Sequence, residues 1–165
     1  MKLKISILLS AIILLFSCQR DQEETQSIDQ VLKLYIKNST NPDLLNPKIK
    51  GSYTSASLLD LLGPKDSLVI TGYSLLKDSD TITYLDYPAG AIRLKIDSLS
   101  NDNEQIYYSL FALKLTKSAT SSDKDLIKIE YKSTPSAFQI SKLWYNGELK
   151  FTKIPGQPNI VTIVK

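Results

Sequence analysis

Ile106-Tyr-Tyr-Ser-Leu-Phe-Ala-Leu-Lys-Leu115 is the longest candidate strand in this sequence of 165 residues. Its aromatic and β-branched residues favour the extended conformation. Apolar residues stand at consecutive positions in its first part, so both faces would be covered, as in a central strand. The stretch predicts a β-sheet with this segment in its interior, and the segments around it are expected to supply the neighbouring strands.

These segments alternate apolar and polar side chains, which is the period of a half-buried strand. Residues 92–97 show the pattern before the central stretch, and residues 127–132 show it afterwards. The turn Asn146-Gly147 is the strongest hairpin signal, because both residues tolerate positive φ. The remaining predicted strands are residues 68–76 and 81–87, joined by a turn at 77–80, then 138–145 and 149–151 around Asn146-Gly147, and finally 160–164.

The region before residue 66 predicts helices instead. Ser27-Ile-Asp-Gln30 has the pattern of a capping box, in which the serine hydroxyl and the glutamine side chain satisfy free amides at a helix start. The apolar residues that follow the spacing of one helical stripe are Ile28, Val31, Leu32 and Tyr35. Two short helical turns are expected at residues 41–45 and 57–62, the second ended by Gly63-Pro64.

Helices followed by strands at hairpin spacing predict an α+β fold, with N-terminal helices packed on a curved antiparallel sheet. The order of elements resembles that of the cystatin-like or NTF2-like cone. A β-barrel or a sandwich that carries an N-terminal helix is the alternative, because the sequence does not reveal which strands pair.

The first residues have the three parts of an export signal. Lys2 and Lys4 precede an apolar run, residues 5–16, which is shorter than the roughly 20 residues of a membrane-spanning helix. The run ends in Leu15-Phe-Ser-Cys18, which resembles the lipobox of bacterial lipoproteins. This resemblance implies cleavage between Ser17 and Cys18 and attachment of lipid to Cys18. It divides the chain into a signal peptide (1–17), a lipidated polar tether (18–26) and a single domain (27–165).

The tether is short, charged and free of apolar residues. Gln19-Arg-Asp-Gln-Glu-Glu24 resembles the export signal of Bacteroidota lipoproteins, in which acidic residues behind the lipidated cysteine direct display on the outer face of the cell. An ordinary polar spacer is the alternative reading. The expected location is the outer membrane, held by lipid, and the choice between the periplasmic and the exterior side stays open.

Composition excludes several functional classes. Histidine is absent and cysteine occurs once, so the usual general base, zinc ligands and disulfides are missing. Loss of Lys2 and Lys4 with the signal lowers the formal charge from +3 to +1, and no basic block remains. Nucleic acid is therefore not an expected partner. We expect a monomer without cofactor or metal.

Aromatic residues supply the main candidate binding site. A platform of rings would stack on a sugar through flat apolar faces with polar edges. The alternative is that these residues simply pack in strands. The candidate platform residues are Tyr87, Tyr107, Tyr108, Trp144 and Tyr145.

Three short segments resemble the Asp–Ser/Thr–aliphatic acceptor of O-glycosylation in Bacteroidota. They place candidate acceptors at Ser67, Thr81 and Ser98.

Three functions remain open. The favoured one is a non-catalytic binding or accessory module of the cell envelope that contacts a glycan, a peptide or a partner protein. The second is a hydrolase that works through paired carboxylates. The third is a structural envelope-assembly factor, which would expose a large apolar patch.

Overall fold

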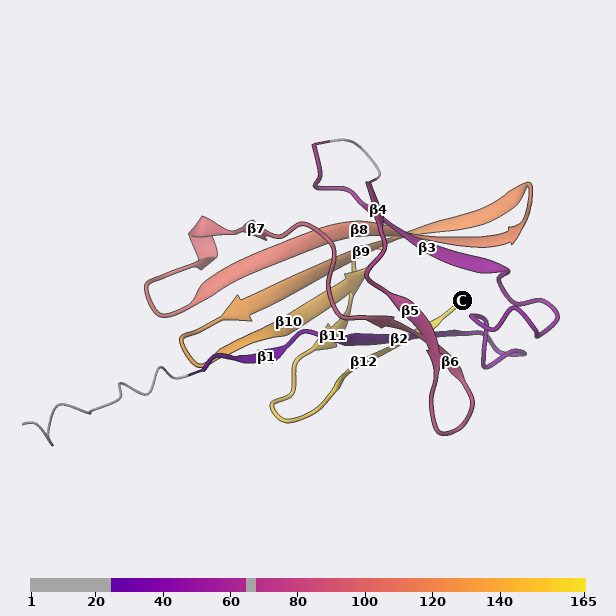
Figure 1. The fold of residues 1–165 in the computed structure, drawn as a ribbon, viewed down its shortest axis with the longest axis horizontal. Helices are drawn as coiled ribbons and strands as arrows, with labels where there is room; N and C mark the ends of the chain where they lie inside the picture. Colours follow the sequence, from indigo (N-terminus) through magenta and orange to yellow (C-terminus); the bar gives the residue numbers. More distant parts are fainter. Residues whose placement is uncertain (1–24, 65–67) are drawn as a thin grey trace, which may run out of the picture.

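Two β-sheets enclose one hydrophobic core in the computed structural model, which describes residues 25–64 and 68–165 (Figure 1). The large sheet has eight strands in the order β1-β10-β9-β8-β3-β4, with β11 paired to β10 and β7 paired to β8. The small sheet has four, in the order β12-β2-β6-β5. The strands are β1 (Ser27–Asp29), β2 (Leu32–Lys37), β3 (Ser55–Asp60), β4 (Leu68–Ile70), β5 (Ser74–Lys77), β6 (Thr83–Tyr87), β7 (Leu94–Lys95), β8 (Gln105–Ser118), β9 (Ser121–Ser133), β10 (Ala137–Tyr145), β11 (Glu148–Thr152) and β12 (Asn159–Val164).

The predicted central strand is confirmed. β8 lies between β9 and β3 in the large sheet, and its three consecutive residues Phe111, Ala112 and Leu113 are all buried. The long strands β8, β9 and β10 run side by side (Figure 1). Of the alternation predicted for residues 127–132, the inward half is confirmed, because Ile127, Ile129 and Tyr131 are fully buried, whereas Glu130 on the opposite face is buried as well.

The predicted N-terminal helix is wrong: residues 27–37 form strands β1 and β2. Ile28, a member of the predicted helical stripe, is 68% exposed, whereas Leu34, which lies off that stripe, is fully buried. Leu32, Leu34 and Ile36 face the core with a period of two, and the half-buried Lys33 and Tyr35 between them lie on the opposite face. Both periods are present in this segment, and the long-range pairing of β2 with β6 and β12 selects the strand.

The two short helical turns are also replaced. Residues 57–60 belong to β3, because they pair with β8 on one side and, from Leu58, with β4 on the other. Residues 41–51 form turns, and just before them the Asn38 side chain accepts hydrogen bonds from the amides of Thr40 and Asn41. Within the described ranges the one helical element is a short 3-10 turn, η1 (Asp97–Leu99).

The fold is therefore all-β, and the predicted α+β class is wrong. Neither the cystatin-like nor the NTF2-like cone fits, because both need the missing N-terminal helix. The alternative, a barrel or sandwich that carries an N-terminal helix, is also wrong about that helix. The large sheet curls into a half-barrel. The pairing is mixed as well, since β1 joins β10 and β12 joins β2 in parallel.

Two other strand predictions need correction. Residues 68–76 do not form one strand: β4 belongs to the large sheet and β5 to the small sheet. Residues 92–97 contribute only the two-residue strand β7, and Leu94 is exposed rather than buried. In both places the chain passes between the large and the small sheet, and the alternation of neighbouring side chains does not reveal such a crossing.

The predicted signal peptide (1–17), Cys18 and most of the predicted tether lie outside the described residues. Across residues 25–64 and 68–165, the structure has no helix that is long and apolar enough to cross a membrane.

The predicted hairpin at Asn146-Gly147 is confirmed. The two residues join β10 to β11 and have φ angles of +50° and +84°. The Asn146 side chain also accepts a hydrogen bond from the Leu126 amide at 2.7 Å and so ties the turn to β9.

Replacing Gly147 with valine should lower the stability by about 1–3 kcal/mol, because a β-branched residue is strained at positive φ. A Cβ at this position meets no atom within 4 Å, so backbone strain alone would account for the loss. Urea unfolding of the wild type and of Gly147→Val and Gly147→Asn chains measures it. We expect asparagine to be tolerated much better than valine, and equal midpoints for all three would contradict the turn geometry.

Candidate functional site

The outward face of the large sheet carries a groove of about 310 Å³. Side chains alternate between the faces of a strand, so the residues beside buried Phe111, Ile127 and Leu143 point away from the core. Leu110, Lys128, Trp144 and Leu149 are successive register partners on β8, β9, β10 and β11 and form one row across this face. The groove is lined by Leu110, Leu126, Lys128, Trp144 and Gly147.

Lys128 lies over two aromatic rings of this face. Its ammonium lies 4.9 Å from the centre of the Trp144 ring and 5.5 Å from that of Tyr108. Trp144 and Tyr108 are both half-buried, so each residue keeps part of its surface open to solvent. The arrangement offers flat apolar surfaces next to a positive charge.

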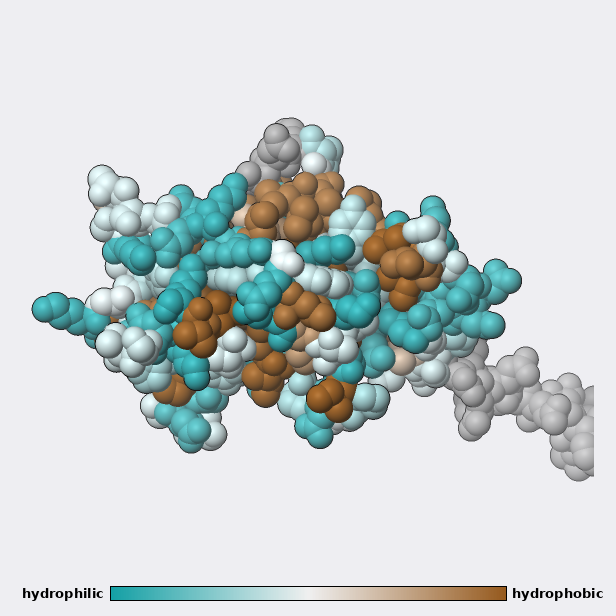
Figure 2. Space-filling view, turned by 180° about the vertical axis from the view of Figure 1, so that it is seen from behind, coloured by the Kyte–Doolittle hydropathy of each residue, from teal (hydrophilic) through white to brown (hydrophobic). Residues whose placement is uncertain are grey.

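The apolar side chains of this face are not covered by another element. Leu126 is 45% and Leu149 is 49% exposed. Seen from the side opposite to Figure 1, the surface shows apolar patches separated by polar side chains (Figure 2). The face therefore suits a ligand that contacts rings and methyl groups at a few places.

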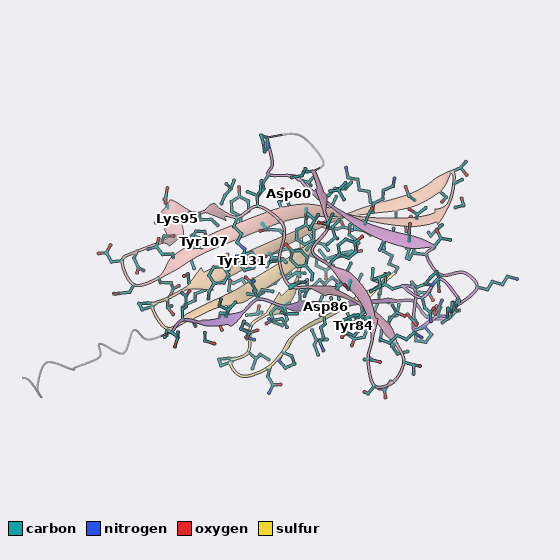
Figure 3. The ribbon with its side chains drawn as sticks, viewed as in Figure 1. Asp60, Tyr84, Asp86, Lys95, Tyr107 and Tyr131 are labelled. Carbon is teal, nitrogen blue, oxygen red and sulfur yellow. The ribbon has the colours of Figure 1, made fainter. Side chains whose placement is uncertain are left out.

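The five predicted platform residues do not form one surface. Trp144 lines the groove and Tyr108 lies beside it, next to Lys128, whereas Tyr87 and Tyr145 are buried in the core. Tyr107 is on the inward face, where it is paired with Tyr131 on β9. In Figure 3, Tyr107 and Tyr131 lie close together on the large sheet. The buried tyrosines are core residues, which was the alternative reading.

Four groove residues were not predicted: Leu110, Leu126, Lys128 and Gly147. Nothing in the sequence around Leu110, Leu126 or Lys128 marks these residues as part of a binding site. Only the register of β8, β9, β10 and β11 brings them together, and the one local signal was the Asn-Gly turn that carries Gly147.

The tertiary structure places Asp123 and Asp125 together, near the C-terminal Lys165. The Lys165 ammonium lies 3.5 Å from Asp123 and 2.5 Å from Asp125. A hydrogen bond from the Tyr53 hydroxyl lowers the pKa of Asp123. Burial opposes ionisation of Asp125, but hydrogen bonds from Lys165 and Asn146 outweigh it and lower its pKa as well. Both groups are ionised at neutral pH, and neither suits a general acid.

The remaining candidate positions are readily placed. Thr81, in the turn between β5 and β6, and Ser98, in η1, are exposed, whereas Ser67 lies outside the described residues. No group of three or more potential metal-ligating side chains occurs within residues 25–64 and 68–165.

Searches against protein-family models, curated proteins and solved structures each found no match.

Proposed function

We propose that this protein is a lipid-anchored lipoprotein of the outer membrane and a non-catalytic binding module that takes a glycan in the groove of its large sheet. The observation that carries the proposal is that Lys128 lies over two aromatic rings, those of Trp144, which lines the open groove, and of Tyr108, which lies beside the groove on the same face. Aromatic faces stack on the apolar faces of sugar rings, and the lysine offers hydrogen-bond donors to hydroxyl or carboxyl groups.

A glycan fits this face better than a peptide does. At the groove, β8, β9 and β10 are each hydrogen-bonded to neighbours on both edges, so their backbone groups are already used. An extended peptide usually binds by adding a strand to a free edge. Recognition over these three strands therefore comes from side chains, which favours a ligand that presents rings.

The two alternative functions have less support. A carboxylate-based hydrolase needs one acid that can be protonated, and the Asp123–Asp125 pair is held ionised. An envelope-assembly factor would expose a continuous apolar patch, but Lys128 stands between the leucines of this face.

The position of the groove fits a tethered protein. The described chain enters through β1, which pairs with β10 around Phe138. Trp144 lies six residues further along β10, about 20 Å away in an extended strand. A lipid anchor ahead of β1 would therefore leave the groove accessible.

Intrinsic fluorescence provides the test, because Trp144 is the single tryptophan of the sequence. The full chain is kept in a non-ionic detergent, and Trp144 is excited selectively. We expect its fluorescence to change saturably when envelope polysaccharides are added. Tyr108→Ala should weaken this binding about tenfold or more, as is usual for an aromatic anchor. Tyr35→Ala, on the small sheet, is the matched control and should leave binding unchanged. Binding that survives Tyr108→Ala undiminished would contradict the proposed site.

The anchor is tested separately. Cys18→Ser removes the thiol that would carry the lipid, so the chain should remain uncleaved after Ser17 and lose its stable lipid attachment. Membrane fractionation and the mass of the mature chain measure this result. An unchanged mature mass would contradict the lipobox reading.

A further inference from the structure

Three lysines on the face of the groove have no acidic partner. Lys114, Lys124 and Lys128 all point outward from β8 and β9, and none forms an ion pair with a described residue. Lys114 and Lys124 are direct register partners, so two like charges stand opposite each other. Such a pair destabilises a sheet. Lys128 lies four residues beyond Lys124 on β9, about 13 Å along the strand.

The next acid along β9 on the same face is already neutralised. Glu130 follows Lys128 at the next outward position of β9 and is largely buried. Its carboxylate lies 3.3 Å from the Lys142 ammonium and accepts a hydrogen bond from the Ser141 hydroxyl at 2.8 Å. The three free lysines therefore leave this face positively charged, although the charge expected for the mature chain is only +1.

We infer that the groove binds an acidic polysaccharide, with Trp144 and Tyr108 contacting sugar rings and Lys114, Lys124 and Lys128 contacting carboxylate groups along the chain. This inference rests on the proposed glycan-binding function and adds the charge of the ligand. An extended polyanion would span both ends of the lysine row and remove the repulsion between Lys114 and Lys124.

The shape of the face favours a polymer in the groove over an anionic membrane surface. A residue that inserts into a bilayer protrudes, whereas Trp144 is half-buried with Lys128 over its ring. The site is also hollowed, with a volume of about 310 Å³. The entry of the described chain through β1 puts a tether at the other end of β10.

The closing experiment compares two polymers that differ only in charge. Polygalacturonate carries a carboxylate on every sugar, and its fully methyl-esterified form has the same backbone without the charge. We expect Trp144 fluorescence of the full chain to show at least tenfold tighter binding of the acidic form, and added salt should weaken that binding. Lys114→Gln and Lys124→Gln should each reduce the affinity roughly twofold to fivefold, as expected of exposed ion pairs. Neither should change the binding of the ester.

Lys33→Gln, on the small sheet, is the matched control and should bind polygalacturonate like the wild type. Equal affinity for the two polymers would overturn the inference and leave the proposed glycan binding intact. Tighter binding to vesicles of anionic lipid or to single-stranded DNA would overturn it in favour of those ligands. A failure of both these polymers and neutral envelope polysaccharides to change the fluorescence would contradict the proposed function itself.

Discussion

Replacing Leu34 with alanine should lower the free energy of unfolding by about 2–5 kcal/mol, the range for deleting a fully buried leucine. Leu34 has no exposed surface. It lies in β2 between its register partners Leu85 on β6 and Val161 on β12, which are also buried. The large sheet closes the core on the other side, so the surroundings can collapse only in part around the cavity.

The matched control is Ile28→Ala, because the two residues exchange roles between the predicted helix and the observed strands. In the helix, Ile28 belongs to the apolar stripe and Leu34 does not. In the structure Ile28 is 68% exposed, so its truncation should cost roughly 0.5 kcal/mol or less. Urea unfolding measures both variants. A larger loss for Ile28→Ala than for Leu34→Ala would contradict the strand assignment of residues 27–37.

Replacing Lys153 with methionine should cost about 3 kcal/mol. The lysine side chain is only 6% exposed. Its ammonium donates to the Asp29 carboxylate at 2.5 Å, to the Gln157 carbonyl at 2.5 Å and to the Asn159 side chain at 2.9 Å. Methionine would fill the space but remove the three hydrogen bonds that these acceptors receive from the ammonium. We place the loss at the low end for a broken buried ion pair, because the Asp29 side chain is 44% exposed and can regain water.

The contacts of Lys153 connect the two sheets. Asp29 ends β1 in the large sheet, and Asn159 begins β12 in the small sheet. The Asn159 amide also donates to the Asp29 carboxylate at 2.8 Å and to the Val31 carbonyl at 3.1 Å. Together these bonds hold the place where the chain crosses from β1 to β2.

Lys95→Met is the control for this variant. Its ammonium lies 3.8 Å from Asp97, and the two side chains are 42% and 90% exposed. Such a pair is worth well under 1 kcal/mol, so the stability should hardly change. If the two lysine variants unfolded at the same urea concentration, the Lys153 contacts would not contribute to stability as described.

The sequence and the structure agree where local pattern and long-range pairing demand the same element. The apolar residues of segment 127–132 repeat with the period of a strand and not with that of a helix. Asn146-Gly147 favours a tight turn, and the strands on its two sides pair with each other. Residues 27–37 satisfy both a helical and a strand period, and the capping-box pattern favoured the wrong one. Local hydrogen bonds in a helix of this length are marginal on their own, so the ladder with β6 and β12 decides.

The binding site was predictable only in part, for the same physical reason. Tyr108 and Trp144 could be singled out as aromatic residues, but nothing local separates them from Tyr87 and Tyr145, which fill the core. The face on which a strand residue lies follows from the register, because a shift by one position exchanges the two faces.

By itself, the sequence determined the central strand, the alternation of residues 127–132 and the Asn146-Gly147 turn, because these depend on residues adjacent in the chain. Tertiary structure alone decided the two-sheet arrangement, the strands at residues 27–37 and the groove. Each of these requires segments distant in sequence to pair: Leu110, Lys128, Trp144 and Leu149 lie on four strands and meet only in register. The positive charge of the groove arises in the same way, since the lysines that create it come from both β8 and β9.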